Sequence, residues 1–164
     1  MLILYYWPGA SSIVPHIVLQ EIGTPYQRQL VNLAQGEHKS DAYLKINPHG
    51  KVPALAVDDT VLTENVAILT YLAKRFPEAD LLPDGMIEQA RCLSMMAWFA
   101  SAVHTTFAHI IRPERFASDS AAHGNLKPYF NTTDVKPIYF QSVASACAVV
   151  STTPCGHGAP RSVG

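Results

Sequence analysis

Hydrophobic and polar positions near the start of the chain follow two periods. Residues 2–7 form a short apolar run that stops at Pro8, as is typical of a buried strand. The period then changes to that of a helix reaching about residue 22, for which Ser11 or Ser12 can serve as N-cap and whose first turn tolerates Pro15. The apolar stripe of this helix consists of Ile13, Val14, Ile17, Val18 and Ile22.

The following stretch predicts a strand, a hairpin and another helix. Residues 27–32 predict a strand, and the weakly periodic residues 33–46 predict a short, mobile helix. Residues 53–57 and 60–62 predict a hairpin, and residues 64–76 predict a helix. One side of that helix carries Ile68, Leu69, Leu72 and Phe76. This order of strand, helix, strand, hairpin and helix predicts an α/β domain of thioredoxin-like fold.

The second half of the chain predicts helices after a linker. Pro77 and Pro83 exclude a continuous helix through this region. A strongly apolar helical segment follows at residues 87–111, and Arg112-Pro113 ends it. The pattern predicts a thioredoxin-like domain at 1–77, a linker at 78–85, an incomplete all-helical domain at 86–127 and an irregular tail at 128–164.

Composition and charge exclude several classes of function. The net charge is −1, from 12 basic and 13 acidic residues without a basic run, so nucleic acid is not an expected partner. No apolar run approaches the length of about 18 residues that a membrane span needs. The 3 cysteines contain no C-x-x-C pair, so we expect neither a disulfide scaffold nor a metal site, and we expect a reducing, cytoplasmic setting.

The most informative motif joins the hairpin to the helix that follows it. Residues 47–53 read Asn-Pro-His-Gly-Lys-Val-Pro, and residues 63–69 read Thr-Glu-Asn-Val-Ala-Ile-Leu. If the bond between Val52 and Pro53 is cis, it would turn the N–H and C=O groups of Val52 outward, where an extended peptide-like ligand can pair with them. The N-terminus of the following helix suits a carboxylate.

These two segments resemble the glutathione-binding half of the glutathione S-transferase family. Residues 4–16, which include Gly-Ala-Ser-Ser and Pro-His, resemble its bacterial, beta-like members. The resemblance covers about residues 1–112 and fades by about residue 127. It implies a thioredoxin-like domain that binds glutathione, and an enzyme that transfers the glutathione thiolate to small hydrophobic electrophiles. It also implies a role in detoxification and a homodimer.

The last part of the chain departs from the family pattern. Family members continue through further helices, whereas residues 128–164 contain four prolines and no sustained helical period. A truncated or frame-altered C-terminus is the explanation we favour, and a natural divergent tail is the alternative. In both cases the apolar face of residues 87–111 lacks part of its cover, which predicts instability, oligomerisation or aggregation. A non-catalytic glutathione-binding or partner-binding module is therefore the alternative to an enzyme.

The resemblance implies that a hydroxyl assists the sulfur of glutathione. A thiol with a pKa of about 8.5 is mostly protonated at neutral pH, although the thiolate is the nucleophile. Ser11 stands at the start of the first helix, where beta-like relatives carry a cysteine, and serine disfavours redox chemistry because it cannot form a mixed disulfide. Ser12 and Tyr6 are the alternatives for this role. Without such a role the serines are N-caps and the tyrosine is a core residue.

The same resemblance implies contacts along the rest of glutathione. The backbone of Val52, with Pro53 setting its geometry, is expected to pair with the cysteinyl part. Asn65 and the free N–H groups of the helix are expected to meet the γ-glutamyl carboxylate, and Glu64 its ammonium group. The alternative reading of Glu64 and Asn65 is a capping pair after Thr63.

Charged side chains supply the remaining candidates. Lys51 is expected to meet the glycine carboxylate, with His38 or Lys39 as weaker candidates; the alternative for each is a solvated loop charge. His104 lies on the long helical segment, where beta-like relatives often have a histidine facing the sulfur. The alternative is a partly buried structural histidine.

Overall fold

The computed structural model describes residues 1–129, so the part of the predicted tail beyond residue 129 lies outside the described residues. The chain divides into two compact units, Met1–Ala100 and a second that starts at Ser101. Each unit is described by itself. The predicted domain limits at residues 77 and 86 stay a prediction.

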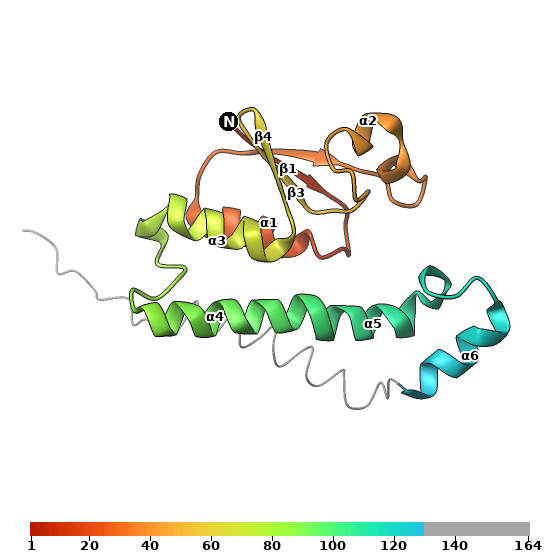
Figure 1. Ribbon diagram of the computed structural model, residues 1–164. Coiled ribbons are helices and arrows are strands. Elements are labelled where there is room, and N and C mark those ends of the chain that lie inside the picture. Colours follow the sequence, from red (N-terminus) through yellow and green to blue (C-terminus); the bar gives the residue numbers. More distant parts are fainter. Residues whose placement is uncertain (130–164) are drawn as a thin grey trace, which may run out of the picture. The chain divides into compact units, whose positions relative to one another are not determined.

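The first unit is built on a mixed, four-stranded sheet with the strand order β2-β1-β3-β4. Strand β1 (Leu2–Tyr6) runs parallel to β2 (Gln27–Leu30) and antiparallel to β3 (Ala54–Val57), which pairs with β4 (Thr60–Thr63) in a hairpin. Figure 1 shows the sheet with α1 and α3 on one side and α2 on the other. The thioredoxin-like order predicted from the hydrophobic pattern is confirmed.

Helices α1 (Ile13–Ile22) and α3 (Asn65–Arg75) cover one face of the sheet. Successive side chains of a strand point to opposite faces, so Leu2 and Leu4 of β1 share this face. They form one core cluster with residues of both helices and of β3. Its buried members are Leu2, Leu4, Leu19, Leu55, Ile68 and Leu72.

The opposite face of β1 packs against the segment around α2 (Asp41–Leu44), which follows a 3-10 turn at Glu37–Lys39. A second cluster of buried residues lies there and consists of Val31, Tyr43 and Val52. Tyr5 packs against this cluster, and its ring meets that of Tyr43 edge-on at a centroid distance of 5.9 Å. The predicted short helix is present, and it anchors the segment that precedes Pro53.

The buried face of α1 differs from the predicted apolar stripe. Ile13, Val14 and Ile17 are 52%, 38% and 46% exposed, respectively. The buried residues of α1 are instead Pro15 and Leu19, and Val18 and Ile22 are partly buried beside them. Positions 15, 18, 19 and 22 follow helical spacing equally well, and the packing against the sheet selected this face.

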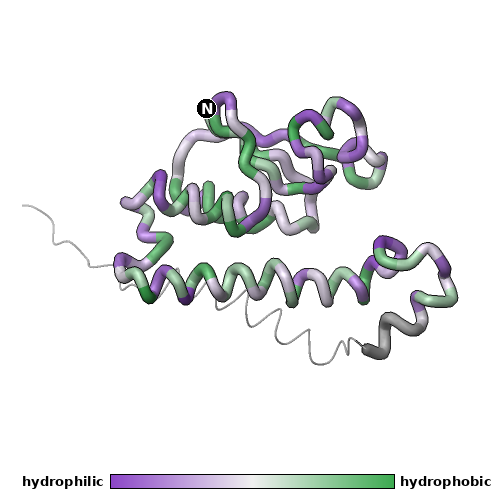
Figure 2. Tube along the Cα trace, viewed as in Figure 1, coloured by the Kyte–Doolittle hydropathy of each residue, from purple (hydrophilic) through white to green (hydrophobic). Residues whose placement is uncertain are grey.

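After a 3-10 turn at Pro77–Ala79, the first unit continues with α4 (Met86–Trp98), none of whose residues is buried. Figure 2 shows hydrophobic residues interspersed with polar ones along this helix. A π-helical turn at Phe99–Val103 joins it to α5. The predicted segment 87–111 is therefore helical throughout, with a local change of period in its middle.

The second unit contains helices only in its described part. Helix α5 (His104–Ile111) ends directly before Arg112-Pro113, as predicted. A 3-10 turn at Pro113–Arg115 and α6 (Ser120–Tyr129) follow. Among the helices of the described residues, none has the length and apolar character that crossing a membrane requires.

Candidate functional site

The two serines between β1 and α1 have different surroundings. The hydroxyl of Ser12 donates to the carbonyl of Trp7 at 3.1 Å and accepts from the N–H of the same residue at 3.2 Å. Ser12 is only 1% exposed, so its hydroxyl closes the loop and is committed to the backbone. Although Ser12 precedes the first helical residue, its side chain makes no capping hydrogen bond.

Ser11 faces a different part of the chain. Its hydroxyl donates to the carbonyl of Val52 at 3.5 Å, a long distance for an O–H···O bond. The hydroxyl is therefore weakly held and is available to a stronger acceptor. The fold thus brings together Ser11 and Val52, which the sequence predicted as parts of one site from segments 41 residues apart.

Val52 stands where the loop enters β3, and the bond between Val52 and Pro53 is cis. Both residues are buried. Among the described residues, no hydrogen bond is found from the Val52 N–H, and the Val52 carbonyl receives only the long bond from Ser11. A donor and an acceptor on one residue are thus open to an added peptide-like strand.

The N-terminus of α3 is tied to Ser11. The side-chain amide of Asn65 donates to the Ser11 carbonyl at 3.2 Å, and this carbonyl also accepts from the N–H of Val14 at 3.2 Å. The side-chain oxygen of Asn65 is buried and accepts no hydrogen bond within the described part of the chain. Asn65 therefore holds the start of α3 against the start of α1.

Glu64 occupies an unusual backbone conformation directly before α3. Its φ of 67° is positive, which is uncommon for a residue with a side chain, and its side chain makes no capping hydrogen bond. Its carbonyl begins the helix by accepting from Ile68 at 3.0 Å. The exposed carboxylate and the open N–H groups of α3 thus lie beside each other.

The strain at Glu64 leads to a stability prediction. Glu64→Ala and Glu64→Gly both remove the carboxylate, but only glycine adopts a positive φ without steric cost. The free energy of unfolding of the glycine variant is expected to exceed that of the alanine variant by about 1 kcal/mol, so the glycine variant is the more stable of the two. Chemical denaturation of both variants measures the difference, and equal midpoints and slopes would show that the backbone is unstrained.

The three candidate cations lie on two adjoining segments. Lys51 and Lys39 are exposed, and His38 is partly buried and precedes Lys39 in the 3-10 turn. A side chain built on Gly50, next to Lys51, would come within 2.9 Å of the His38 carbonyl. The 3-10 turn therefore lies directly against the loop that carries Lys51.

The same approach makes Gly50 sensitive to substitution. Gly50 has a φ of 58° and faces the His38 carbonyl, whereas Gly23 has a φ of 71° with nothing within 4 Å of its missing side chain. Gly23→Ala is expected to lower the free energy of unfolding by about 1–2 kcal/mol, because the left-handed conformation disfavours a side chain. Gly50→Ala should lose a further ~1–3 kcal/mol to the clash. Thermal melts of the two variants compare them, and equal losses would contradict the close approach.

The other predicted site residue and the cysteines lie apart from these segments in the chain. His104 is the first residue of α5 in the second unit, and its role stays a prediction. Cys92 in α4 is a free thiol, and Cys147 and Cys155 lie outside the described residues. Within the described residues, no group of three or more His, Cys, Asp and Glu side chains could hold a metal ion.

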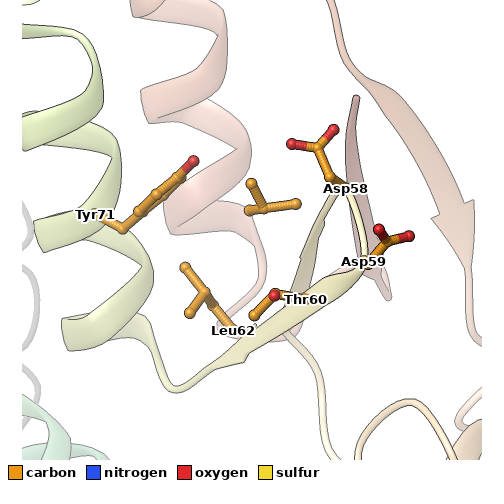
Figure 3. A pocket seen from close by; sticks show the side chains of 6 residues that line it. Asp58, Asp59, Thr60, Leu62 and Tyr71 are labelled. Atoms are coloured by element: carbon orange, nitrogen blue, oxygen red, sulfur yellow. The ribbon is translucent and has the colours of Figure 1, made fainter.

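A shallow hollow of about 420 Å³ lies at the opposite end of the sheet, around the β3–β4 turn (Figure 3). Its lining residues are Val57, Asp58, Asp59, Thr60, Leu62 and Tyr71. Val57 pairs with Leu2 at the beginning of β1, whereas Ser11 follows the end of β1. The N-terminal amino group bonds to Asp58 and lowers the pKa of its carboxyl group. None of the predicted site residues lines this hollow.

Sequence and structure comparisons relate this chain to glutathione S-transferases. The family model for the N-terminal domain of glutathione S-transferases matches residues 1–74. A glutathione transferase homologue from Sulfitobacter, solved with bound glutathione, has 33% sequence identity and a TM-score of 0.75, over 93% of this chain and 70% of that one. The glutathione S-transferase GstA of Escherichia coli O157:H7 is 39% identical over 68% of this chain and 57% of its own length. A maleylacetoacetate isomerase of Pseudomonas aeruginosa is 38% identical over 60% of this chain and 48% of its own length.

These similarities define the class of protein: a thioredoxin-like domain that contains a cis Val-Pro bond, followed by helices. The chain belongs to the glutathione S-transferase family. It spans about half the length of the curated relatives it matches, 57% of the Escherichia coli protein and 48% of the isomerase.

Proposed function

We propose that this protein binds glutathione and transfers its thiolate to small hydrophobic electrophiles. The observation that carries the proposal is the pairing of the weakly held Ser11 hydroxyl with the open backbone groups of Val52. A tripeptide that pairs with Val52 through its cysteinyl residue has its sulfur near the start of α1. The glutathione bound to the Sulfitobacter relative supports this choice of ligand.

The proposed chemistry rests on stabilising an anion. The Ser11 hydroxyl donates a hydrogen bond to the sulfur, and the N-terminus of α1 favours negative charge beside it. Together they are expected to contribute about 1–3 kcal/mol, equivalent to lowering the thiol pKa by about one to two units. The thiol proton leaves to solvent, the sulfur forms a bond to the electrophilic carbon, and the leaving group departs with the electron pair of its own bond.

The rest of the ligand is assigned to the neighbouring residues. Glu64 meets the γ-glutamyl ammonium, and the N–H groups of α3 with Asn65 meet its carboxylate. Lys51 meets the glycine carboxylate, with His38 or Lys39 as substitutes. For His104 we keep the role that the family resemblance implies, a histidine that faces the sulfur. The expected homodimer, cytoplasmic location and detoxification role belong to the same proposal.

The test combines binding with turnover. Calorimetric titration of the folded protein with glutathione is expected to give heat of binding, and chlorodinitrobenzene as acceptor is expected to give steady-state conjugation. Binding without turnover on any acceptor of a panel would favour the alternative of a non-catalytic binding module. No heat from a protein that melts cooperatively would overturn glutathione binding altogether.

A glutathione-dependent isomerisation is the second candidate. The 38% identity to a maleylacetoacetate isomerase over 60% of this chain favours it. The same thiolate would add to a carbon of the substrate double bond and leave again after rotation about the resulting single bond. Including maleylacetoacetate in the acceptor panel separates the two: isomerisation regenerates free glutathione, whereas conjugation consumes it.

A further inference from the structure

The loop that precedes Val52 is closed by one buried asparagine. Asn47 is 2% exposed, and its side-chain amide donates to the Lys51 carbonyl at 2.7 Å. Its side-chain oxygen accepts from the His49 N–H at 3.0 Å, and its own carbonyl accepts from Gly50 at 2.9 Å. Asn47 therefore uses its amide, its side-chain oxygen and its backbone within the loop.

A tyrosine from α2 reaches the same carbonyl. Tyr43 is 4% exposed, and its hydroxyl donates to the Lys51 carbonyl at 2.7 Å. Burial raises the pKa of Tyr43 to about 12, so the hydroxyl keeps its proton and remains a donor throughout the neutral range. With Asn47 and Tyr43 bound, the two acceptor positions of this carbonyl are occupied.

This carbonyl belongs to the peptide group that carries the Val52 N–H. The bond between Lys51 and Val52 is trans, so its C=O and N–H point in opposite directions. Two short hydrogen bonds on the carbonyl side therefore fix the direction of the N–H on the other side. That N–H makes no hydrogen bond within the described residues, and it lies on the residue whose carbonyl faces Ser11.

We propose that Tyr43 and Asn47 are positioning residues that hold the Val52 N–H ready for the backbone of the bound ligand. The inference rests on the proposed function, because it assigns the Val52 N–H to the cysteinyl part of glutathione. Neither side chain touches the ligand in this arrangement. Their effect is on the affinity for glutathione, and the reactivity of its sulfur depends on Ser11 instead.

The test compares two tyrosine variants. Tyr43→Phe removes the hydroxyl from the Lys51 carbonyl, and Tyr26→Phe removes a hydroxyl that bonds to Gln20 on the surface at 2.5 Å. Tyr43→Phe is expected to raise the Kd for glutathione and for S-methylglutathione by the same factor, about three- to tenfold. It should raise the KM for glutathione similarly while leaving kcat and the pH profile of kcat unchanged. Tyr26→Phe should change none of these values.

A second variant keeps the test informative if Tyr43→Phe folds poorly. Asn47→Asp retains the oxygen that accepts from His49 but presents an acceptor to the Lys51 carbonyl at neutral pH. Its affinity for glutathione should be lower than that of the parent at pH 7. It should recover relative to the parent toward pH 5, as the new carboxyl gains a proton and becomes a donor.

The results of these experiments distinguish a failure of the positioning role from a failure of the proposed function. Parent-like Kd and KM in a folded Tyr43→Phe, or a change in kcat or in its pH profile with KM unchanged, would overturn the positioning role alone. A pH-independent affinity of Asn47→Asp relative to the parent would also overturn it. Absence of glutathione binding by the folded parent protein would overturn the proposed function and this inference with it.

Discussion

Replacing Ser11 with alanine is expected to lower kcat/KM for conjugation at pH 7 by about threefold to tenfold. The hydroxyl faces Val52 and is held there only by a long hydrogen bond of 3.5 Å to the Val52 carbonyl. Removing it deprives the thiolate of a hydrogen bond, so the pKa of the bound thiol rises and less thiolate is present at neutral pH. The loss should shrink as the pH rises, because both proteins then carry the thiolate.

The measurement is the pH dependence of kcat/KM for the parent and for Ser11→Ala. The midpoint of the rising limb should move up by about half a unit to one unit in the variant, because the N-terminus of α1 still favours the thiolate. The thermal midpoint should stay close to that of the parent, because a long, partly exposed hydrogen bond contributes little to stability. A variant with the parent rate and the parent pH profile would remove Ser11 from the mechanism.

Replacing Ser12 with alanine is expected to have the complementary effect, a loss of stability. The Ser12 hydroxyl satisfies both the N–H and the carbonyl of Trp7 inside the loop. Alanine would leave the Trp7 N–H without its partner, whereas the Trp7 carbonyl would still accept from the N–H of Ala10 at 3.2 Å. The cost of one unsatisfied donor is about 1–3 kcal/mol before relaxation. A loss of about 1–2 kcal/mol in the free energy of unfolding corresponds to a fall of roughly 4–16 °C in Tm for a domain of this size.

Ser94→Ala provides the matched control, because Ser94 is exposed on α4. Its free energy of unfolding should lie within about 0.5 kcal/mol of that of the parent. At a temperature where Ser12→Ala is fully folded, the midpoint of its pH profile should match the parent, since Ser11 is intact. A Ser12→Ala variant as stable as Ser94→Ala would show that the loop between β1 and α1 does not depend on the Ser12 hydroxyl.

The hydrophobic pattern predicted most of the first unit. The run at residues 2–7 and the apolar positions Ile68 and Leu72 led to β1 and α3, because a strand and an amphipathic helix each impose their own spacing. The pattern was less successful for α1. Apolar residues occur around most of that helix, so spacing alone could not tell that Leu19 is buried and Ile13 is exposed.

The sequence indicated some residues of the candidate site and left the roles of others open. The proline motif indicated Val52 and the start of α3, but it gave no way to choose between Ser11 and Ser12. Only the fold shows that one hydroxyl is bonded to Trp7 while the other faces Val52. Asn47 was part of the motif without an assigned role, although asparagine before a proline is a common turn former. Tyr43 carried no local signal, because its contact with the loop depends on how α2 packs.

The sequence by itself determined the order of the elements, the Val-Pro segment and the chemical groups near it, because these follow from local spacing and residue type. The tertiary structure decided which face of α1 is buried, which serine hydroxyl remains weakly held and which side chains support the Lys51 carbonyl. Each of these depends on groups distant in the chain, such as Ser11 with Val52 and Asn65 with Ser11. Such contacts are set by the packing of the sheet and helices together, and local sequence does not encode them separately.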